Sequence, residues 1–167
     1  SEKCEKITSF ELHAHRAELI KDYARRMGKQ NITVICRDSA VFDEKYSQTF
    51  DAVLCDCPCS GSGVLKDNPD IKLNRKESDI LSLNDTQSKI LNACSRYVKA
   101  GGELYYSTCS VLKAENICQK FLRENPEFTE EKFSCELPHE NSSCGVTFLP
   151  HLSLGAGFFV CKFRRKS

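Results

Sequence analysis

Phe50-Asp51-Ala52-Val53-Leu54-Cys55-Asp56 has the apolar run and the β-branched and aromatic residues of a buried strand, and it ends in an acid. Residues 7–12, 31–36 and 103–108 have the same character, and the first two also deliver an acid at or just after their carboxyl ends. These four segments are the strands around which we expect the rest of the chain to be arranged.

Helices are predicted between these strands. Residues 14–27 carry apolar side chains at spacings of three and four and are followed by a glycine. A second helix over 83–98 has Asn84 and Gln87 as a capping pair and stops at a glycine pair, and a third helix covers 113–123. Strands that alternate with helices predict an α/β fold, with a parallel sheet and helices on its faces.

Two later parts of the sequence depart from this alternation. Segments 128–133, 145–149 and 157–163 predict strands with no helix between them, which fits an antiparallel end on the parallel sheet. Residues 57–79 are polar and rich in turn-forming residues, and the segment is too long for a simple connection. It predicts a functional loop that contains one helical turn.

The composition is that of one globular domain over residues 1–167, with 40% apolar and 28% charged residues. No apolar run reaches the ~18 residues of a membrane helix, and the first residues lack the apolar core of a signal peptide. We therefore expect a soluble protein in the cytoplasm, without a membrane partner. The net charge of +1 leaves the binding of nucleic acid to local basic patches.

The 11 cysteines do not form a recognisable framework. Their number is odd, so a complete set of intramolecular disulfides is impossible. The closest cluster, Cys55-x-Cys57-x-Cys59, has no second half at zinc-ligand spacing, so no metal is expected and a zinc or redox protein is disfavoured. Most other thiols have apolar neighbours and are expected to be small buried hydrophobes, among them Cys4, Cys36, Cys94, Cys118 and Cys161.

Chemistry is expected at the carboxyl ends of the strands, where ligands bind in open α/β sheets. The candidates there are Glu11, Asp38, Asp56 with Pro58-Cys59, and Ser107-Thr108-Cys109. Each has a structural alternative, because acids after strands also cap helices and form turns, and cysteines there often serve packing. Their joint placement at successive strand ends favours a site, since an acid after the second strand of a nucleotide-binding sheet usually holds ribose hydroxyls.

Two of these segments carry a family resemblance. Residues 56–64, Asp-Cys-Pro-Cys-Ser-Gly-Ser-Gly-Val, and residues 106–111, Tyr-Ser-Thr-Cys-Ser-Val, closely resemble the paired signatures of the Sun (Fmu-type) family of RNA cytosine-5 methyltransferases. Glu115-Asn116, the segment 68–72 and the Gly-Phe-Phe at 157–159 also match the family. The resemblance extends from about residue 7 to residue 163 and implies a Rossmann-like class I methyltransferase sheet.

The resemblance implies covalent catalysis. Carbon 5 of cytosine is a poor nucleophile, and addition of a thiolate to carbon 6 makes it reactive. In the family this attack belongs to the cysteine at Cys109, while Cys59 assists later elimination of the enzyme. DNA cytosine methyltransferases attack with a Pro-Cys cysteine instead, so Cys59 is the alternative nucleophile. Asp56 is expected to contact ring nitrogen 3 and the exocyclic amine.

The implied cofactor is S-adenosylmethionine (S-adenosyl-L-methionine). Glu11 resembles the family's ribose-binding acid, with Arg16 assisting, and Asp38 resembles its adenine contact. Asp56 is expected to border the cofactor as well as the base. Gly61 and Gly63 would let the backbone approach the substrate.

RNA is the implied partner, with ribosomal RNA preferred over transfer RNA, and a monomer is expected. The basic residues of the loop after Cys59 are candidates for phosphate contacts, with a solvated surface as the alternative; they are Lys66, Lys72, Arg75 and Lys76. Attack on carbon 6 requires the cytosine to leave its stack, so a loop nucleotide is the expected target.

One family feature has no counterpart in the sequence. The Ala-Pro-Gly-Gly-Lys loop that follows the family's first strand is missing, and residue 7 matches the start of the second strand. We therefore expect a partial catalytic domain without the first strand, its cofactor loop and the upstream RNA-binding region, and without turnover on its own. The alternative function is a non-catalytic RNA-binding or assembly module that keeps the methyltransferase fold.

Overall fold

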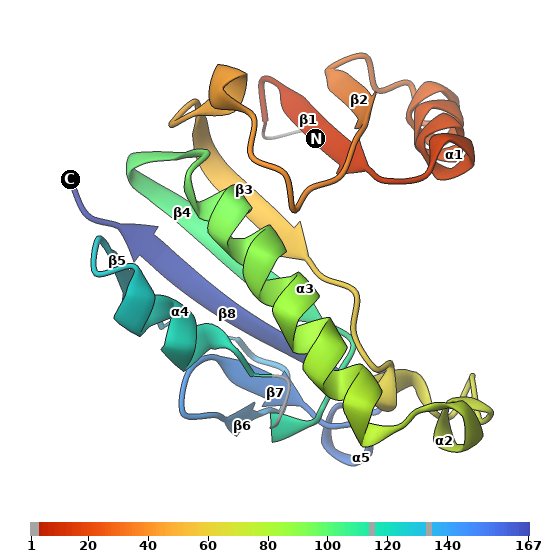
Figure 1. The fold of residues 1–167 in the computed structure, drawn as a ribbon. Coiled ribbons are helices and arrows are strands. Elements are labelled where there is room, and N and C mark those ends of the chain that lie inside the picture. The colour runs from red at the N-terminus through yellow and green to blue at the C-terminus, as the bar shows by residue number, and fades with distance from the viewer. Residues whose placement is uncertain (1–3, 114–115, 133–134) are drawn as a thin grey trace. The chain divides into compact units, whose positions relative to one another are not determined.

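The chain forms two units in the computed structural model, which describes residues 4–113, 116–132 and 135–167 (Figure 1). One unit extends to Val41, and Phe42–Ser167 form the other. The single partial catalytic domain expected over residues 1–167 stays a prediction.

The first unit is a β-α-β crossover. β1 (Ile7–Glu11) and β2 (Ile32–Cys36) pair in parallel, with Glu11 opposite Cys36, and α1 (Ala14–Arg26) connects them. Gly28 follows the end of the helix, and its φ of +65° reverses the chain toward β2 at little steric cost. The predicted strand–helix–strand order is confirmed here.

The second unit contains a mixed sheet in which β3 and β4 are parallel and β8 is antiparallel to β4 (Figure 1). The antiparallel strands come last in the sequence, so the predicted α/β fold with an antiparallel end is confirmed. The order across the sheet is β3 (Phe50–Asp56), β4 (Val98–Thr108), β8 (Phe158–Arg165), β7 (Val146–Phe148) and β6 (Glu140–Asn141), and β5 (Phe128–Glu130) also pairs with β8.

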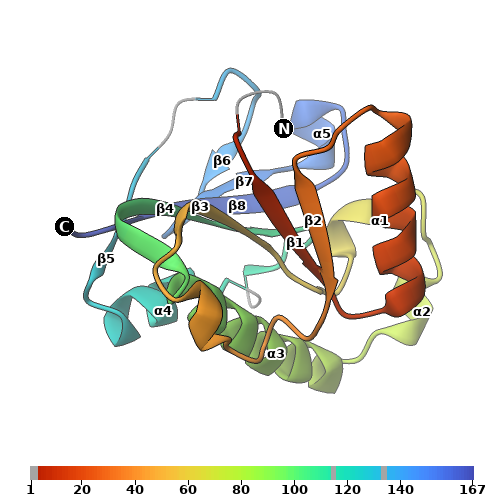
Figure 2. The same cartoon turned by 90° about the horizontal axis from the view of Figure 1, so that it is seen from above.

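Two helices cover the same side of this sheet, α3 (Glu77–Ser95) and α4 (Cys118–Glu124) (Figure 2). The core lies beneath them, where Leu91 of α3 and Phe121 of α4 meet buried residues of β4 and β8 such as Leu104 and Phe163. No helix among the described residues has the length and apolarity needed to cross a membrane. Four short elements complete the unit: η1 (Glu44–Tyr46), η2 (Ser62–Val64), α2 (Ile71–Asn74) and α5 (Pro150–Ser153).

The long loop after β3 is shorter than predicted because α3 starts early. The predicted start near residue 83 is wrong, and so is the capping role of Asn84 and Gln87, which lie inside the helix. The first turn is capped instead at Lys76, whose backbone N–H donates to Asp79 Oδ2 at 2.9 Å. The loop therefore ends at Lys76, and α2 is its predicted helical turn.

Several other boundaries differ from the prediction. β4 begins at Val98 and runs through the glycine pair, because Gly101 at φ +73° adapts the strand to a register shift opposite Phe50 and Ala52. α4 begins at Cys118; of the residues predicted to form its start, Ala114 and Glu115 lie outside the described residues. Phe133, the predicted end of a strand, also lies outside them.

The carboxyl-terminal strands have two additional elements. The short strand β6 and the one-turn helix α5 were not predicted, and α5 lies between β7 and β8, where no helix was expected. Pro150 at its first position starts α5 in the usual way. The helix is too short to show an apolar period.

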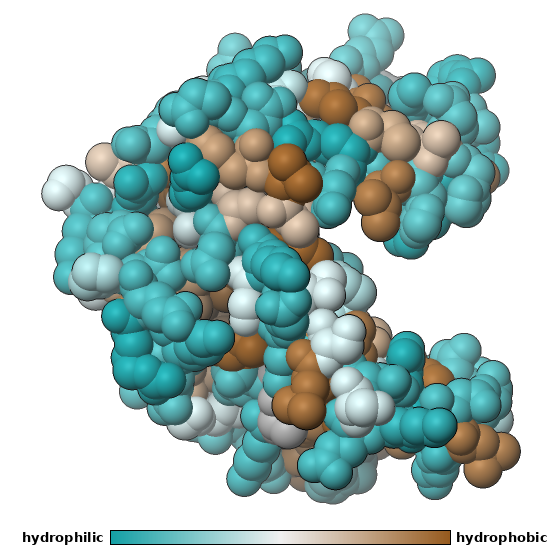
Figure 3. All heavy atoms as spheres, in the orientation of Figure 1, coloured by the Kyte–Doolittle hydropathy of each residue, from teal (hydrophilic) through white to brown (hydrophobic). Residues whose placement is uncertain are grey.

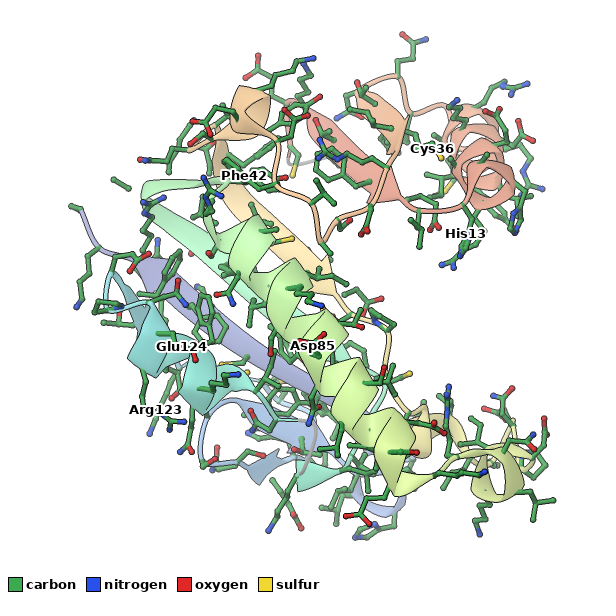
Figure 4. The ribbon with its side chains drawn as sticks, in the orientation of Figure 1. His13, Cys36, Phe42, Asp85, Arg123 and Glu124 are labelled. Carbon is green, nitrogen blue, oxygen red and sulfur yellow. The ribbon has the colours of Figure 1, made fainter. Side chains whose placement is uncertain are left out.

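The buried-cysteine prediction is confirmed for Cys94, Cys118 and Cys161 and is wrong for Cys4 and Cys36. Cys4 precedes β1, and Cys36 is the last residue of β2, so the apolar neighbours of each in the sequence do not form a core around it. Figure 4 labels Cys36 at this strand end.

Gln87 is the polar residue that joins the helix layer to the sheet and to the loop after β3. Its side chain is fully buried, with Nε2 donating to the Pro58 carbonyl at 2.9 Å and Oε1 accepting from the Tyr106 hydroxyl at 3.0 Å. A buried amide satisfied at both ends fixes the spacing between α3, β4 and that loop.

Replacing Gln87 by alanine tests this connection. We expect the substitution to lower the free energy of unfolding by about 1–3 kcal/mol, because it leaves a buried hydroxyl and a buried carbonyl without their partner. Asp85→Asn on the exposed face of α3 (Figure 4), which removes the carboxylate paired with Lys89, is the control and should cost about 0.5 kcal/mol or less. Equal urea midpoints for the two variants would contradict the proposed role of Gln87.

Candidate active site

Two thiols meet where the parallel strands β3 and β4 end. Asp56 of β3 lies opposite Ser107 of β4, so the segments that leave the two strands start side by side. The first segment continues through Pro58, and the second continues beyond Thr108. Cys59 Sγ and Cys109 Sγ then lie 2.9 Å apart, although fifty positions separate them in the sequence.

Asp56, the last residue of β3, is held by its strand neighbour Ser107. The Ser107 hydroxyl donates to Asp56 Oδ1 at 2.9 Å, and the backbone N–H of Cys57 donates to the Ser107 carbonyl at 3.0 Å. Ser107 is buried while Asp56 is exposed, so the serine fixes a carboxylate that faces solvent. Ser107 belongs to the second sequence motif, but the motif predicts no separate role for it.

A hydroxyl network holds the two cysteine segments together. The Ser110 hydroxyl lies 3.1 Å from that of Ser62 and 3.4 Å from that of Ser60, and the backbone N–H of Val111 donates to Ser62 Oγ at 3.0 Å. Ser60 and Ser110 are buried. These serines were not predicted to matter, although their alternation with Cys59, Gly61 and Cys109 was visible in the motifs.

The two glycines of the first motif differ in their roles. Gly61 has a φ of +77°, a conformation that side chains disfavour. Gly63 was expected to let the backbone approach the substrate, but it packs against protein backbone instead. A Cβ there would lie 2.2 Å from the Gly157 carbonyl oxygen and 2.7 Å from that of Cys109. Its N–H donates to Cys109 O at 2.9 Å, so Gly63 brings protein backbones together.

The surroundings of Cys59 hold its thiol in the protonated form. Burial raises the pKa of the Cys59 thiol to about 12, and the hydrogen bond with Cys109 contributes further in the same direction. Cys59 therefore keeps its proton at neutral pH.

The first unit carries the acids predicted to contact the cofactor. Glu11 accepts the His13 backbone N–H on Oε1 at 3.0 Å and pairs with Arg16 through Oε2 at 3.2 Å. Asp38 follows the adjacent strand β2 and accepts the Ala40 N–H at 2.8 Å. Glu11 is the last residue of β1 and Asp38 follows the neighbouring parallel strand β2, so both lie at the same edge of the two-stranded sheet.

The loop cations are all exposed: Lys66, Lys72, Arg75 and Lys76. The Arg75 Nε also donates to the Ser60 carbonyl at 3.3 Å, which connects the basic segment to the segment that carries Cys59. Figure 3 shows mainly hydrophilic spheres around α2 with a few apolar ones among them, and Leu73 there is 86% exposed.

The fold and the position of the reactive groups define the class of the protein. A parallel strand pair extended by an antiparallel strand, with helices on its face and reactive groups at the strand ends, is the architecture of Rossmann-like methyltransferases. The solved structure of NSun6 from Pyrococcus horikoshii with SFG shares this fold at a TM-score of 0.80 and 23% identity, over 97% of this chain and 42% of that one.

Sequence comparison gives the particular family. A family model described as 16S rRNA methyltransferase RsmB/F matches residues 1–164, and the chain belongs to this family. It is 37% identical over 169 residues to the probable ribosomal RNA small subunit methyltransferase B of Bacillus subtilis (strain 168), over 96% of the chain. It also matches the crystal structure of PH0851 at a TM-score of 0.90 and 29% identity, over 96% of this chain and 37% of that one.

The resemblance stated from the motifs is therefore confirmed at the level of the family. The chain spans only 38% of the Bacillus protein and 35% of ribosomal RNA small subunit methyltransferase F of Shewanella piezotolerans, to which it is 34% identical over 168 residues and 96% of its length. The family defines the fold around the thiol pair. The roles of its individual residues stay predictions.

The raised pKa of Cys59 predicts a characteristic pattern of alkylation. Because the thiolate is the reactive form, iodoacetamide should modify exposed Cys4 readily near pH 8 while Cys59 stays unmodified, with its rate rising about tenfold per pH unit toward pH 12. In a Cys109→Ala variant the pKa of Cys59 should fall only part of the way, because burial remains. Peptide mass spectrometry measures both rates. Rapid modification of Cys59 at pH 8 in the unsubstituted chain would contradict this ordering.

Proposed function

We propose that the polypeptide containing this chain transfers a methyl group to carbon 5 of a cytosine in 16S rRNA. The observation that carries the proposal is the 2.9 Å separation of Cys59 and Cys109 at the ends of two parallel strands. Attack on a pyrimidine and later release of the enzyme need two groups that reach one base, and these two sulfurs are close enough to do so. The rRNA substrate is suggested by the family description.

Cys109 is the proposed nucleophile. Its thiolate forms a bond to carbon 6, and the electron pair of the 5,6 double bond moves to carbon 5, which then accepts a methyl group. Loss of the proton from carbon 5 restores the double bond and breaks the carbon–sulfur bond. The protonated state of Cys59 at neutral pH supports this assignment over the alternative in which Cys59 attacks.

Cys59 and Asp56 have the supporting roles. Cys59, next to the attacking sulfur, is placed to exchange a proton during release of Cys109 from carbon 6. Asp56, oriented by Ser107, is proposed to contact ring nitrogen 3 and the exocyclic amine, so that the flipped base is recognised as cytosine. The mechanism needs the base to leave its stack, and a single-stranded nucleotide of the rRNA is the expected target.

The donor groups of the first unit fit S-adenosylmethionine. Carboxylates at the ends of neighbouring parallel strands are suited to ribose hydroxyls and to the amine of adenine, and we propose Glu11 for the ribose and Asp38 for the adenine. Arg16 holds the Glu11 carboxylate in place through its ion pair. When bound, the cofactor supplies the sulfonium methyl group. Asp56 is proposed to border it as well as the base.

The basic loop residues are proposed to follow the RNA backbone. They are exposed and connected to the Cys59 segment through Arg75, which suits phosphate contacts that place a nucleotide at the thiols. We further propose that the enzyme acts in the cytoplasm as a monomer. Residues 1–167 alone are proposed to lack turnover, and a non-catalytic RNA-binding module is the second candidate function.

Two cysteine substitutions separate the catalytic proposal from the binding module. In the full-length polypeptide, Cys109→Ala should abolish tritiated methyl transfer from S-adenosylmethionine to unmodified 16S rRNA, because no covalent adduct forms. Cys59→Ala should instead accumulate a protein–RNA adduct that survives denaturing electrophoresis. Cys94→Ala, at a buried thiol outside the site, is the control. Undiminished transfer by the Cys109 variant would refute the mechanism.

The cofactor assignment has its own test in the same full-length polypeptide. Glu11→Gln should weaken binding of S-adenosylmethionine about tenfold or more, because hydrogen bonds to a charged group contribute about 1.5–3 kcal/mol each. Glu18→Gln on the exposed face of α1 removes the same charge at an ion pair with Lys21 and should leave affinity unchanged. Isothermal titration calorimetry compares the two, and equal dissociation constants would exclude Glu11 from the cofactor site.

A further inference from the structure

A second group of sulfurs lies apart from the Cys59–Cys109 pair. The thiols of Cys118, Cys144 and Cys161 lie within 4.8 Å of one another, and Cys144 Sγ is 3.4 Å from Cys161 Sγ. All three residues are buried, with exposed fractions of 0%, 1% and 0%. None of them takes part in the proposed methyl transfer.

These thiols come from three different parts of the second unit. Cys118 is the first residue of α4, Cys144 lies in the turn between β6 and β7, and Cys161 lies within β8. They are 26 and 17 positions apart, so no short sequence motif joins them. For this reason no metal site was predicted from these cysteines. We propose that this cluster is a structural zinc site.

The sulfur geometry suits tetrahedral zinc. Zinc–sulfur bonds are about 2.3 Å long, so two thiolates on one tetrahedral zinc ion lie about 3.8 Å apart. The separations of 3.4 Å and at most 4.8 Å bracket this value, so a zinc ion requires only small side-chain movements. On coordination each thiol loses its proton to solvent as its bond to zinc forms.

Glu130 is the candidate for the fourth ligand. Its Oε1 accepts the backbone N–H of Gly145 at 2.9 Å, which holds the carboxylate beside the turn that carries Cys144. A carboxylate oxygen is a common zinc ligand and a poor one for monovalent copper, which prefers sulfur alone. The set of three thiolates and one carboxylate therefore favours zinc.

The surrounding backbone is already fixed for such a site. Asn116 donates from Nδ2 to the Cys144 carbonyl at 3.1 Å and accepts the Cys118 N–H on Oδ1 at 3.1 Å, so one side chain holds two of the three cysteine backbones. A Cβ at Gly145 would lie 2.9 Å from the Cys161 Cβ, so glycine lets the turn approach β8 closely. Zinc here would join α4, β8 and the β6–β7 turn.

Metal uptake by the 167-residue chain is the direct test. Since the thiols are buried, the chain should be refolded under a phosphine reductant with Zn²⁺, or with Co²⁺ as a spectroscopic probe. We expect one metal ion per chain by mass spectrometry of the metal, and thiolate-to-cobalt charge-transfer absorption with tetrahedral d–d bands. Absence of stoichiometric metal, or uptake of monovalent copper but not zinc, would overturn the proposal.

Matched cysteine variants locate the ion. Cys144→Ala should weaken zinc binding more than 100-fold, because it removes a ligand. Changes to residues around the ligands typically cost only about 10–100-fold. Cys94→Ala, also at a buried thiol, is the control and should leave the zinc affinity unchanged. Loss with Cys59→Ala or Cys109→Ala but not with Cys144→Ala would place the metal elsewhere and refute the proposal.

A footprint on the unsubstituted chain covers the case in which Cys144→Ala fails to fold. Zinc should raise the thermal midpoint of the chain and protect Cys118, Cys144 and Cys161 from N-ethylmaleimide in partly denaturing urea, with no protection of Cys94. Equal labelling of all four with and without zinc, or a Cys144–Cys161 disulfide in a chain that takes up no zinc when reduced, would show that the cluster is not a zinc site.

Discussion

The parallel register of β3 and β4 is the constraint on which the candidate active site depends. With Asp56 opposite Ser107, the serine hydroxyl reaches the carboxylate, and the chains that follow carry Cys59 and Cys109 to within 2.9 Å of each other. A slip of one residue would turn every side chain of one strand to the other face and separate these groups. The chemistry of the site is therefore set by backbone pairing before any side chain is considered.

Buried polar side chains then fix the segments beyond the strands. The Gln87 side chain donates a hydrogen bond to the Pro58 carbonyl. The hydroxyl network of Ser60, Ser62 and Ser110 joins the two cysteine segments. The segments that carry the thiols are therefore held by hydrogen bonds within the protein. Such rigid segments suit a site that must keep two reactive groups in place while a base enters. Burial also raises the pKa of the Cys59 thiol.

The sequence predicted the strands of this fold well and its helix starts less well. β3 has the predicted boundaries because its apolar run is clearly delimited in the sequence. The start of α3 was predicted too late, because its first turn is polar and shows no apolar period. That turn is stabilised by the cap between Lys76 and Asp79. The motif cysteines could be predicted because the pattern of strand ends and the family resemblance point to the same residues. Gln87 could not, since a glutamine on an apolar helix face gives no sign of the partners it finds.

The cluster of Cys118, Cys144 and Cys161 could not be predicted from the sequence, for a related reason. Its members are small apolar-looking residues far apart in the chain, and only the pairing of β8 with β7 and the packing of α4 bring them together. Composition counts cysteines but cannot show which of them converge. In this protein one group converges at the strand ends and another within the core.

The close approach of Gly63 and Gly157 limits how the protein can change over evolution. The N–H of Gly157 donates to the Gly63 carbonyl at 2.7 Å, and neither residue has space for a methyl group. Mutations there would be rejected although neither residue performs any chemistry, because a single added carbon would force apart the segments that carry the sulfurs. Sequence drift at the site is thus limited by steric exclusion as much as by catalysis.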